Sequence, residues 1–100
     1  MKIIERCYEE LKYVFDPELA VNIVDLGLID HIDLTDDHSV TVTMNVLEHT
    51  KKDDIACLVK GVKYALRFVD GIEKVKVNIV SNPSWTPERM NEQMKKQLIG

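Results

Sequence analysis

Apolar and charged residues alternate with helical spacing over the first part of the chain. Apolar side chains recur every three or four positions with charged residues between them, a pattern typical of one amphipathic helix of about three turns. Asp16-Pro17 is expected to end this helix, because a residue that precedes proline is disfavoured in the α region. The segment 18–27 follows no clean period and is predicted to be an ordered loop. The apolar positions of the helix are Ile3, Ile4, Cys7, Tyr8, Leu11, Val14 and Phe15.

Two strand-like runs, 28–34 and 40–47, come next and flank a polar turn at 35–39. A polar cluster of this length commonly joins antiparallel neighbours, so the two runs are predicted to form a hairpin. The second run alternates clearly, and its two sides are expected to face the core and the open face of a sheet. The core side holds Val40, Val42, Met44 and Val46, and the open side holds Thr41, Thr43 and Asn45.

A second helical pattern covers 55–69 and stops before Asp70-Gly71, where the glycine is expected to be the C-cap. At the other end, Thr50 is expected to cap the helix together with Asp53, which lies three residues later. The polar stretch 48–54 would then connect the hairpin to this helix.

The remaining residues predict one more strand and one more helix. Residues 75–79 alternate apolar and polar side chains as a strand does, and a proline-broken loop follows at 81–85. Thr86-Pro87-Glu88 has the order of an N-cap, a first helical residue and a first-turn acid, so the last helix is expected to begin there. Its apolar face would hold Met90, Met94 and Leu98.

The predicted order is therefore α-β-β-α-β-α, an α/β fold in a single domain covering 1–100. The second strand, second helix and third strand form a crossover, which makes those two strands parallel neighbours if they share one sheet. Together with the hairpin, this gives a small three-stranded mixed sheet with helices packed on it.

Composition and charge narrow the classes of function. Hydrophobic residues are 45% of the chain and charged residues 30%, as in a globular protein. The formal net charge of −4 disfavours binding to nucleic acid. No apolar run approaches the ~20 residues that cross a bilayer, and the chain enters its amphipathic helix directly, so neither membrane insertion nor export is expected. With only Cys7 and Cys57 available, reduced thiols in the cytoplasm are expected rather than a disulfide.

Polar residues within apolar loops are the first candidates for function. In the segment 16–27, Asp16, Glu18, Asn22 and Asp25 sit among apolar neighbours and need hydrogen-bond partners. Such residues commonly bind turn amides, which is the structural interpretation. Trp85, the single tryptophan, either folds its ring over the sheet edge or contributes to a contact surface.

Candidate metal ligands are few. His49 lies in a charged loop, where a lone histidine is usually solvated. Cys57 falls inside the second helix and is more simply an inert thiol, while Cys7 is on the apolar stripe of the first helix. No motif of known catalytic sites occurs in the sequence.

Two longer motifs carry a family resemblance. The chain contains Asp16-Pro-Glu-Leu19 followed by Asn22-Ile-Val-Asp-Leu-Gly-Leu-Ile29, and later Pro83-Ser-Trp-Thr-Pro-Glu-Arg-Met90. With these motifs and its element order, the sequence resembles the small iron–sulfur cluster assembly domains that include SufT and PaaD. The resemblance implies an α/β assembly-factor fold, a cytoplasmic setting and a role in iron–sulfur protein maturation without turnover chemistry.

The sequence departs from this family at one place. The family usually carries Thr-x-x-x-Cys-Pro between the second strand and the second helix, where a thiolate could bind metal. The cysteine position falls on Lys51 or Lys52 here. A lysine ammonium has no free lone pair at neutral pH and cannot replace a thiolate ligand. We therefore expect no resident cofactor and regard even transient binding of an iron–sulfur cluster as disfavoured.

Three functions remain open at this point. The first is a non-catalytic assembly or adaptor factor that contacts the iron–sulfur assembly machinery or apo-client proteins; the second is a metal or cluster carrier that uses Cys57 and His49. The third is a protein- or RNA-binding module unrelated to metal, disfavoured for RNA by the acidic charge and by strands without aromatic pairs. An exposed strand edge would also permit a homodimer. The expected binding surface consists of Asp16, Glu18, Asn22, Asp25, Trp85 and Arg89.

Overall fold

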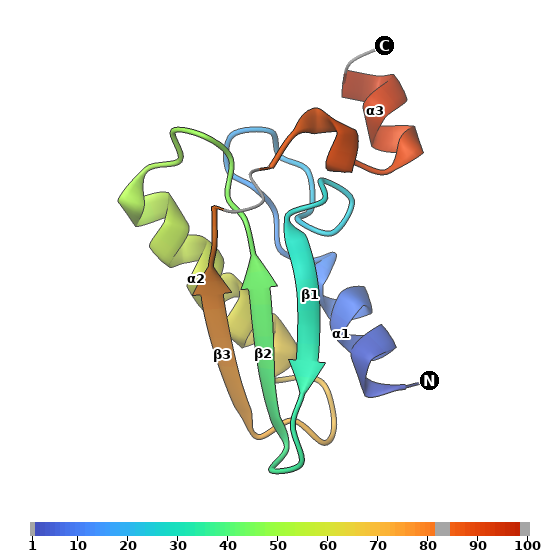
Figure 1. The fold of residues 1–100 in the computed structure, drawn as a ribbon, viewed down its shortest axis with the longest axis vertical. Helices are drawn as coiled ribbons and strands as arrows, with labels where there is room; N and C mark the ends of the chain where they lie inside the picture. The colour runs from blue at the N-terminus through green and yellow to red at the C-terminus, as the bar shows by residue number, and fades with distance from the viewer. Residues whose placement is uncertain (1, 82–84, 99–100) are drawn as a thin grey trace.

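The computed structural model describes residues 2–81 and 85–98, in which two helices pack behind a small sheet (Figure 1). The observed order confirms the predicted α/β arrangement. The elements are α1 (Ile3–Leu11), β1 (Ile29–Leu34), β2 (Ser39–Met44), α2 (Lys52–Leu66), β3 (Lys74–Ile79), the 3₁₀ turn η1 (Pro87–Arg89) and α3 (Glu92–Leu98).

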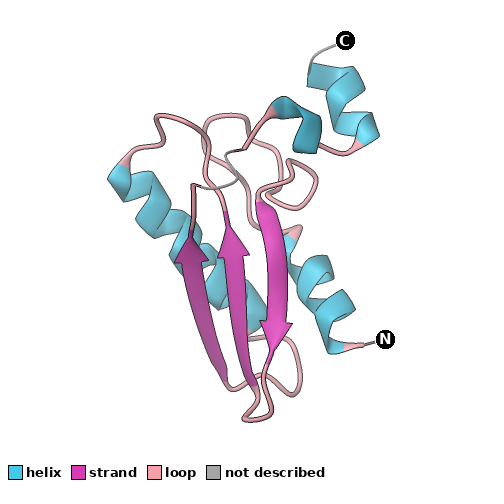
Figure 2. Cartoon of the chain, in the orientation of Figure 1, coloured by secondary structure: helices cyan, strands magenta, loops and turns pink. Residues whose placement is uncertain are grey.

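The sheet has the order β1-β2-β3, so β2 is central (Figure 2). It runs antiparallel to β1 and parallel to β3, with Val42 opposite both Ile32 and Val77. The hairpin and the parallel crossover are therefore as predicted from the sequence. The register of β1 against β2 is irregular between Ile29 and His31, which sets Asp30 apart from the regular pairing.

The core follows the alternation of β2 only as far as that strand extends. Val40, Val42 and Met44 are fully buried. Asn45 was expected on the open face, but this is wrong, because the strand has ended and Asn45 is only 2% exposed. Its backbone N–H donates to the carbonyl oxygen of Leu28 at 2.7 Å, which turns the chain inward at this point.

Helix α1 is shorter than the apolar spacing predicts. It ends at Leu11, and Phe15 lies in extended backbone that forms a β-bridge with Asn22. The N–H of Ile23 donates to the carbonyl oxygen of Val14 at 2.9 Å, so pairing with the following loop competes with the last helical turn. The ring of Phe15 is consequently 56% exposed rather than part of the core.

Helix α2 begins three residues earlier than predicted, at Lys52, and neither predicted cap is present. The hydroxyl of Thr50 donates to the carbonyl oxygen of Leu47 at 2.6 Å, and the N-cap residue Lys51 provides no side-chain cap. The helix ends at Leu66, and Gly71 instead allows the turn before β3, with φ of 93°. No described helix has the length and apolar character needed to cross a bilayer.

The last predicted helix is divided in two. Pro87 starts only the single turn η1, and Met90 after it is extended. The N–H of Asn91 donates to the carbonyl oxygen of Asp25 at 2.9 Å, which removes it from any continuous helix. The side chain of Asn91 accepts the N–H of Met94 at 2.8 Å, so a new helix, α3, begins after this residue.

Candidate functional site

Asp16 organises the start of the loop between α1 and β1. Its carboxylate accepts the backbone N–H groups of Glu18 at 3.0 Å and Leu19 at 3.1 Å, and the residue is 1% exposed. The N–H of Ala20 donates to the carbonyl oxygen of Asp16, and Ala20 takes a left-handed φ of 54°. The turn therefore presents 17–20 to solvent while Asp16 itself is buried.

Asn22 and Asp25 are hydrogen-bonded to each other within the same loop. The amide of Asn22 donates to the Asp25 carboxylate at 2.8 Å, and the N–H of Asp25 donates back to the Asn22 side-chain oxygen at 2.9 Å. Their polar atoms are used to close a turn, as the structural interpretation of this loop predicts.

The segment 85–91, which we call the docked segment, lies against this loop. The indole N–H of Trp85 donates to the carbonyl oxygen of Leu26 at 2.7 Å. The backbone of Arg89 passes directly over Gly27, whose φ of 78° and missing side chain permit the close approach. The two motifs of the family resemblance are thus in direct contact.

A polar cluster beneath the docked segment joins three elements. The guanidinium of Arg89 donates to the carboxylate of Asp30, and both side chains are largely buried, at 24% and 12% exposed. The amide of Asn45 donates to both oxygens of the same carboxylate, at 3.1 and 3.2 Å. Asp30 therefore anchors η1 and the end of β2 on β1.

A cavity of about 540 Å³ opens at the carboxyl ends of β2 and β3, and we call it the strand-end cavity. Trp85 forms one wall, and the connection between β2 and α2 forms another. Lys51 and Lys52, onto which the cysteine position of the family resemblance falls, follow this connection in the chain but do not line the cavity. The described lining consists of Asn45, Val46, Leu47, Glu48, His49, Thr50, Ile79, Val80, Ser81 and Trp85.

The two weak metal candidates belong to different hollows. His49 lines the strand-end cavity, is 87% exposed and lies 3.6 Å from the carboxylate of Glu48. Cys57 is an exposed free thiol that lines a groove between α1 and α2 instead. Within residues 2–81 and 85–98, no three histidine, cysteine or acidic side chains gather as a metal site would require.

The structure thus divides the expected surface residues into two groups. Asp16, Asn22, Asp25, Trp85 and Arg89 have internal hydrogen-bond partners, whereas the side chain of Glu18 is exposed at the loop tip.

Sequence reasoning missed Gly27, Asp30 and Asn45, which hold the two motifs together. Gly27 within the first motif was a usable signal, because a glycine in a loop often marks a left-handed backbone position or a close approach of another segment. Asp30 and Asn45 gave no such signal, since both fall within or beside predicted strands.

Comparison with known proteins matches this architecture to one family. Residues 5–79 match the family described as iron–sulfur cluster assembly protein. An Fe–S protein maturation auxiliary factor from Porphyromonas gingivalis is 34% identical over 88 residues, covering 88% of this chain and 83% of that protein. The Fe–S protein maturation auxiliary factor SufT from Staphylococcus aureus is 32% identical over 87 residues, covering 82% and 92% respectively.

A solved structure agrees with the sequence relatives. The crystal structure of a domain of unknown function, DUF59, from Bacillus anthracis superposes with a TM-score of 0.88 at 32% identity, over 96% of this chain and 91% of that one. The resemblance noted in the sequence is therefore confirmed across most of the length. The chain belongs to the iron–sulfur cluster assembly protein family.

Proposed function

We propose that this chain is a non-catalytic assembly or adaptor factor in the maturation of iron–sulfur proteins. Its partners would be components of the assembly machinery or apo-client proteins, and its site of action the cytoplasm. Membership of the family and the names of its relatives, which are maturation auxiliary factors, support this role.

The observation that carries the proposal is the docking of the two motif segments on each other. Trp85, Arg89 and Asn91 all contact the loop 22–30, so the loop is fixed by a segment about sixty residues away. A surface loop that is fixed in this way already has the conformation that a partner would bind. Binding then carries no further entropic cost of ordering the loop.

The part of the α1–β1 connection offered to a partner is the loop tip, residues 17–20, which the Asp16 carboxylate holds through the N–H groups of Glu18 and Leu19. All four residues are exposed, and the apolar side chain of Leu19 is 40% exposed beside the carboxylate-bearing Glu18. An exposed leucine next to a charge on a rigid turn suits a protein contact, in which an apolar anchor supplies affinity and the charge supplies orientation.

The chemistry at the start of α2 supports contact rather than cluster binding. Lys51 and Lys52, which occupy the family's cysteine position, are exposed ammonium groups without a lone pair for iron. A cluster, as cargo of the pathway, would then be held by the partner proteins, and this chain would bring those proteins together.

The test is an anaerobic pull-down from native cytoplasm with the tagged full chain. We expect it to recover iron–sulfur scaffolds, carriers or apo-enzymes, and Leu19→Asp to reduce the recovery by about tenfold, as for loss of one anchor residue. Leu34→Asp is the matched control, because Leu34 has a similar exposure of 43% on the far end of β1.

Two results would overturn the proposal. One is a deletion strain in which iron–sulfur enzyme activities stay unchanged under iron limitation. The other is stoichiometric iron and sulfide on the purified chain after anaerobic reconstitution, with a visible charge-transfer band that disappears in Cys57→Ala. That second result would favour the carrier function.

A further inference from the structure

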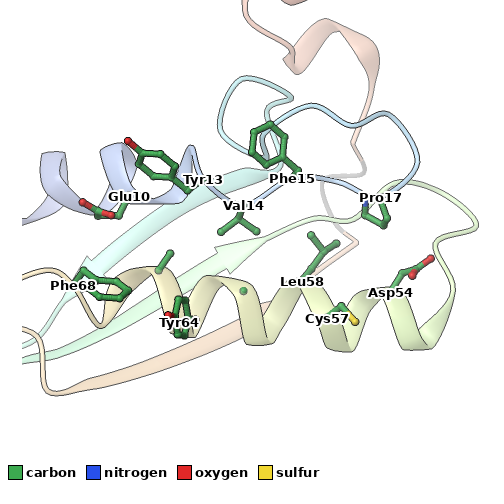
Figure 3. A pocket seen from close by; sticks show the side chains of 12 residues that line it. Glu10, Tyr13, Val14, Phe15, Pro17, Asp54, Cys57, Leu58, Tyr64 and Phe68 are labelled. Atoms are coloured by element: carbon green, nitrogen blue, oxygen red, sulfur yellow. The ribbon is translucent and has the colours of Figure 1, made fainter.

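Helices α1 and α2 lie behind the sheet (Figure 1), and an apolar groove of about 730 Å³ runs between them (Figure 3). We call it the α1–α2 groove. Its lining comes from the end of α1, the chain that follows α1 and one side of α2. The lining residues that carry the argument are Glu10, Tyr13, Phe15, Asp54, Cys57 and Phe68.

The groove exposes an unusual amount of aromatic surface. Tyr13 is 78% exposed, Phe15 56%, Tyr64 59% and Phe68 58%. Tyr64 and Phe68 also pack edge to face with ring centroids 5.4 Å apart, so their orientations are set. Clustered exposed rings at a hollow are characteristic of a protein contact, since a solvent-facing surface has no reason to gather them.

The shape of the groove fits a helix. Its α2 wall extends from Asp54 to Ala65, which at 1.5 Å per residue is about 17 Å, or three helical turns, and Phe68 continues the wall just beyond the helix. Gly61 lies midway along this wall, opposite Val14. A Cβ at residue 61 would lie 3.2 Å from Cγ1 of Val14. The absence of a side chain at residue 61 lets α2 pack closely against Val14, which forms the floor of the groove.

The charges of the groove are acidic. Glu10 and Asp54 are the charged members of its described lining and lie at opposite ends of it (Figure 3). Glu10 is already paired with Arg6 at 3.1 Å, whereas Asp54 has no ion pair among the described residues. An occupant would therefore place a basic side chain beside Asp54.

We propose that the α1–α2 groove binds an amphipathic helix of a partner protein, with its apolar face against the aromatic rings and a lysine or arginine beside Asp54. Helix-in-groove recognition uses this combination of an apolar trough and flanking charge. A second copy of this chain fits less well, because α3 has only seven residues and would fill about half of the groove. Anionic lipid is disfavoured by the acidic lining.

This inference does not rest on the proposed function. The groove and the loop tip share Pro17, which lines the groove and is the first residue of the tip. An adaptor with two such surfaces could hold two proteins at once, but each surface is tested separately.

The probe is a fluorescent synthetic helical peptide of about 18 residues, long enough to span the groove. One face carries leucines, and each end carries a lysine; the control peptide has glutamates in place of those lysines. We expect the purified full chain to bind the lysine peptide at least tenfold more tightly than the glutamate peptide. Bound peptide should also slow the reaction of the Cys57 thiol with a disulfide reagent, because Cys57 lines the groove.

Variants with matched controls locate the binding. Phe68→Ser should weaken lysine-peptide binding at least tenfold, while Leu34→Ser, at a similarly exposed position outside the groove, should not. Asp54→Lys should reverse the preference between the two peptides. Asp53→Lys adds the same charge in the same helical turn but outside the lining, and should leave the preference unchanged.

Each of three outcomes would overturn the inference. The first is failure of both peptides to bind at millimolar concentration. The second is binding that Phe68→Ser and Asp54→Lys leave unchanged, or that does not protect Cys57. The third is a dimer in sedimentation that Phe68→Ser abolishes, which would assign the groove to a second copy.

Discussion

Gly27 lies against the backbone of Arg89 so closely that a Cβ at residue 27 would overlap the Arg89 carbonyl oxygen. The contact joins two segments that are far apart in the sequence, and backbone rather than a flexible side chain is the obstacle. The left-handed φ of 78° at Gly27 adds a second requirement for glycine. This position therefore decides whether the docked segment can sit on the loop.

Gly27→Ala is expected to destabilise the fold by about 2–4 kcal/mol, since it combines backbone strain with displacement of the docked segment. Urea unfolding would measure this, and the fluorescence of Trp85, the single tryptophan, should shift as its ring becomes more exposed. Gly61→Ala is the control, because Gly61 is helical and its nearest neighbour is a Val14 methyl group. Equal unfolding midpoints for the two variants would contradict the role of Gly27.

Asp30→Ala should cost about 3–5 kcal/mol, because it leaves the largely buried Arg89 guanidinium without its counter-ion and Asn45 without its acceptor. The pair of Lys95 with Glu88, at 3.2 Å, is the comparison, because the Glu88 side chain is 84% exposed whereas that of Asp30 is 12% exposed. Lys95→Ala should change the free energy of unfolding by at most about 1 kcal/mol. Denaturant titration of both variants measures the difference, and similar values would count against a structural role for the Asp30 cluster.

The two thiols should react at very different rates in the native protein. Cys57 is exposed, whereas Cys7 is fully buried and burial raises its pKa, so Cys7 stays protonated at neutral pH. A thiol reagent should modify Cys57 quickly and Cys7 only after denaturation. In Cys57→Ala the fast reaction should be absent.

The raised pKa of Cys7 also sets a pH dependence. The stabilising effect of keeping this thiol neutral is complete below the pKa of the unfolded chain and is lost as the pH rises through the folded pKa. Thermal melts should therefore show stability falling in the alkaline range in which thiols ionise. A flat alkaline profile would contradict this assignment.

Asp37 should titrate at an unusually low pH. Its pKa is lowered because its carboxylate interacts first with the hydroxyl of Thr35 and then with the side chain and the backbone N–H of Ser39. A lowered folded pKa contributes stability above the unfolded pKa, and that contribution is lost as the pH falls through the folded pKa. In Thr35→Val the pKa of Asp37 should rise toward its ordinary value, as followed by carboxyl carbon NMR shifts. The same midpoint in both proteins would exclude the hydroxyl as the cause.

Most of the fold could be predicted from local periodicity. The alternation in β2 and the helical spacing in α2 are short-range signals, and both elements sit where these patterns place them within a few residues. The mixed sheet then follows from the order of elements and the crossover rule.

The details of the site could not be predicted in this way, because they depend on contacts between distant residues. Arg89 reaches Asp30 across 59 positions, and Trp85 reaches Leu26 across the same number. The same contacts explain the errors at the last helix, since the N–H of Asn91 is used by Asp25 rather than by a helical turn. Periodicity carries no information about such competition.

The match to the family ends with β3. Residues beyond β3 nevertheless bind groups within the matched part, namely the carboxylate of Asp30 and backbone carbonyl oxygens of the preceding loop. Truncation after residue 80 would remove the Arg89 counter-ion of Asp30. It would also remove the hydrogen-bond donors to the carbonyl oxygens of Asp25 and Leu26. Engineering of this protein should accordingly treat the docked segment as an internal component of the domain, and place tags or fusions ahead of α1.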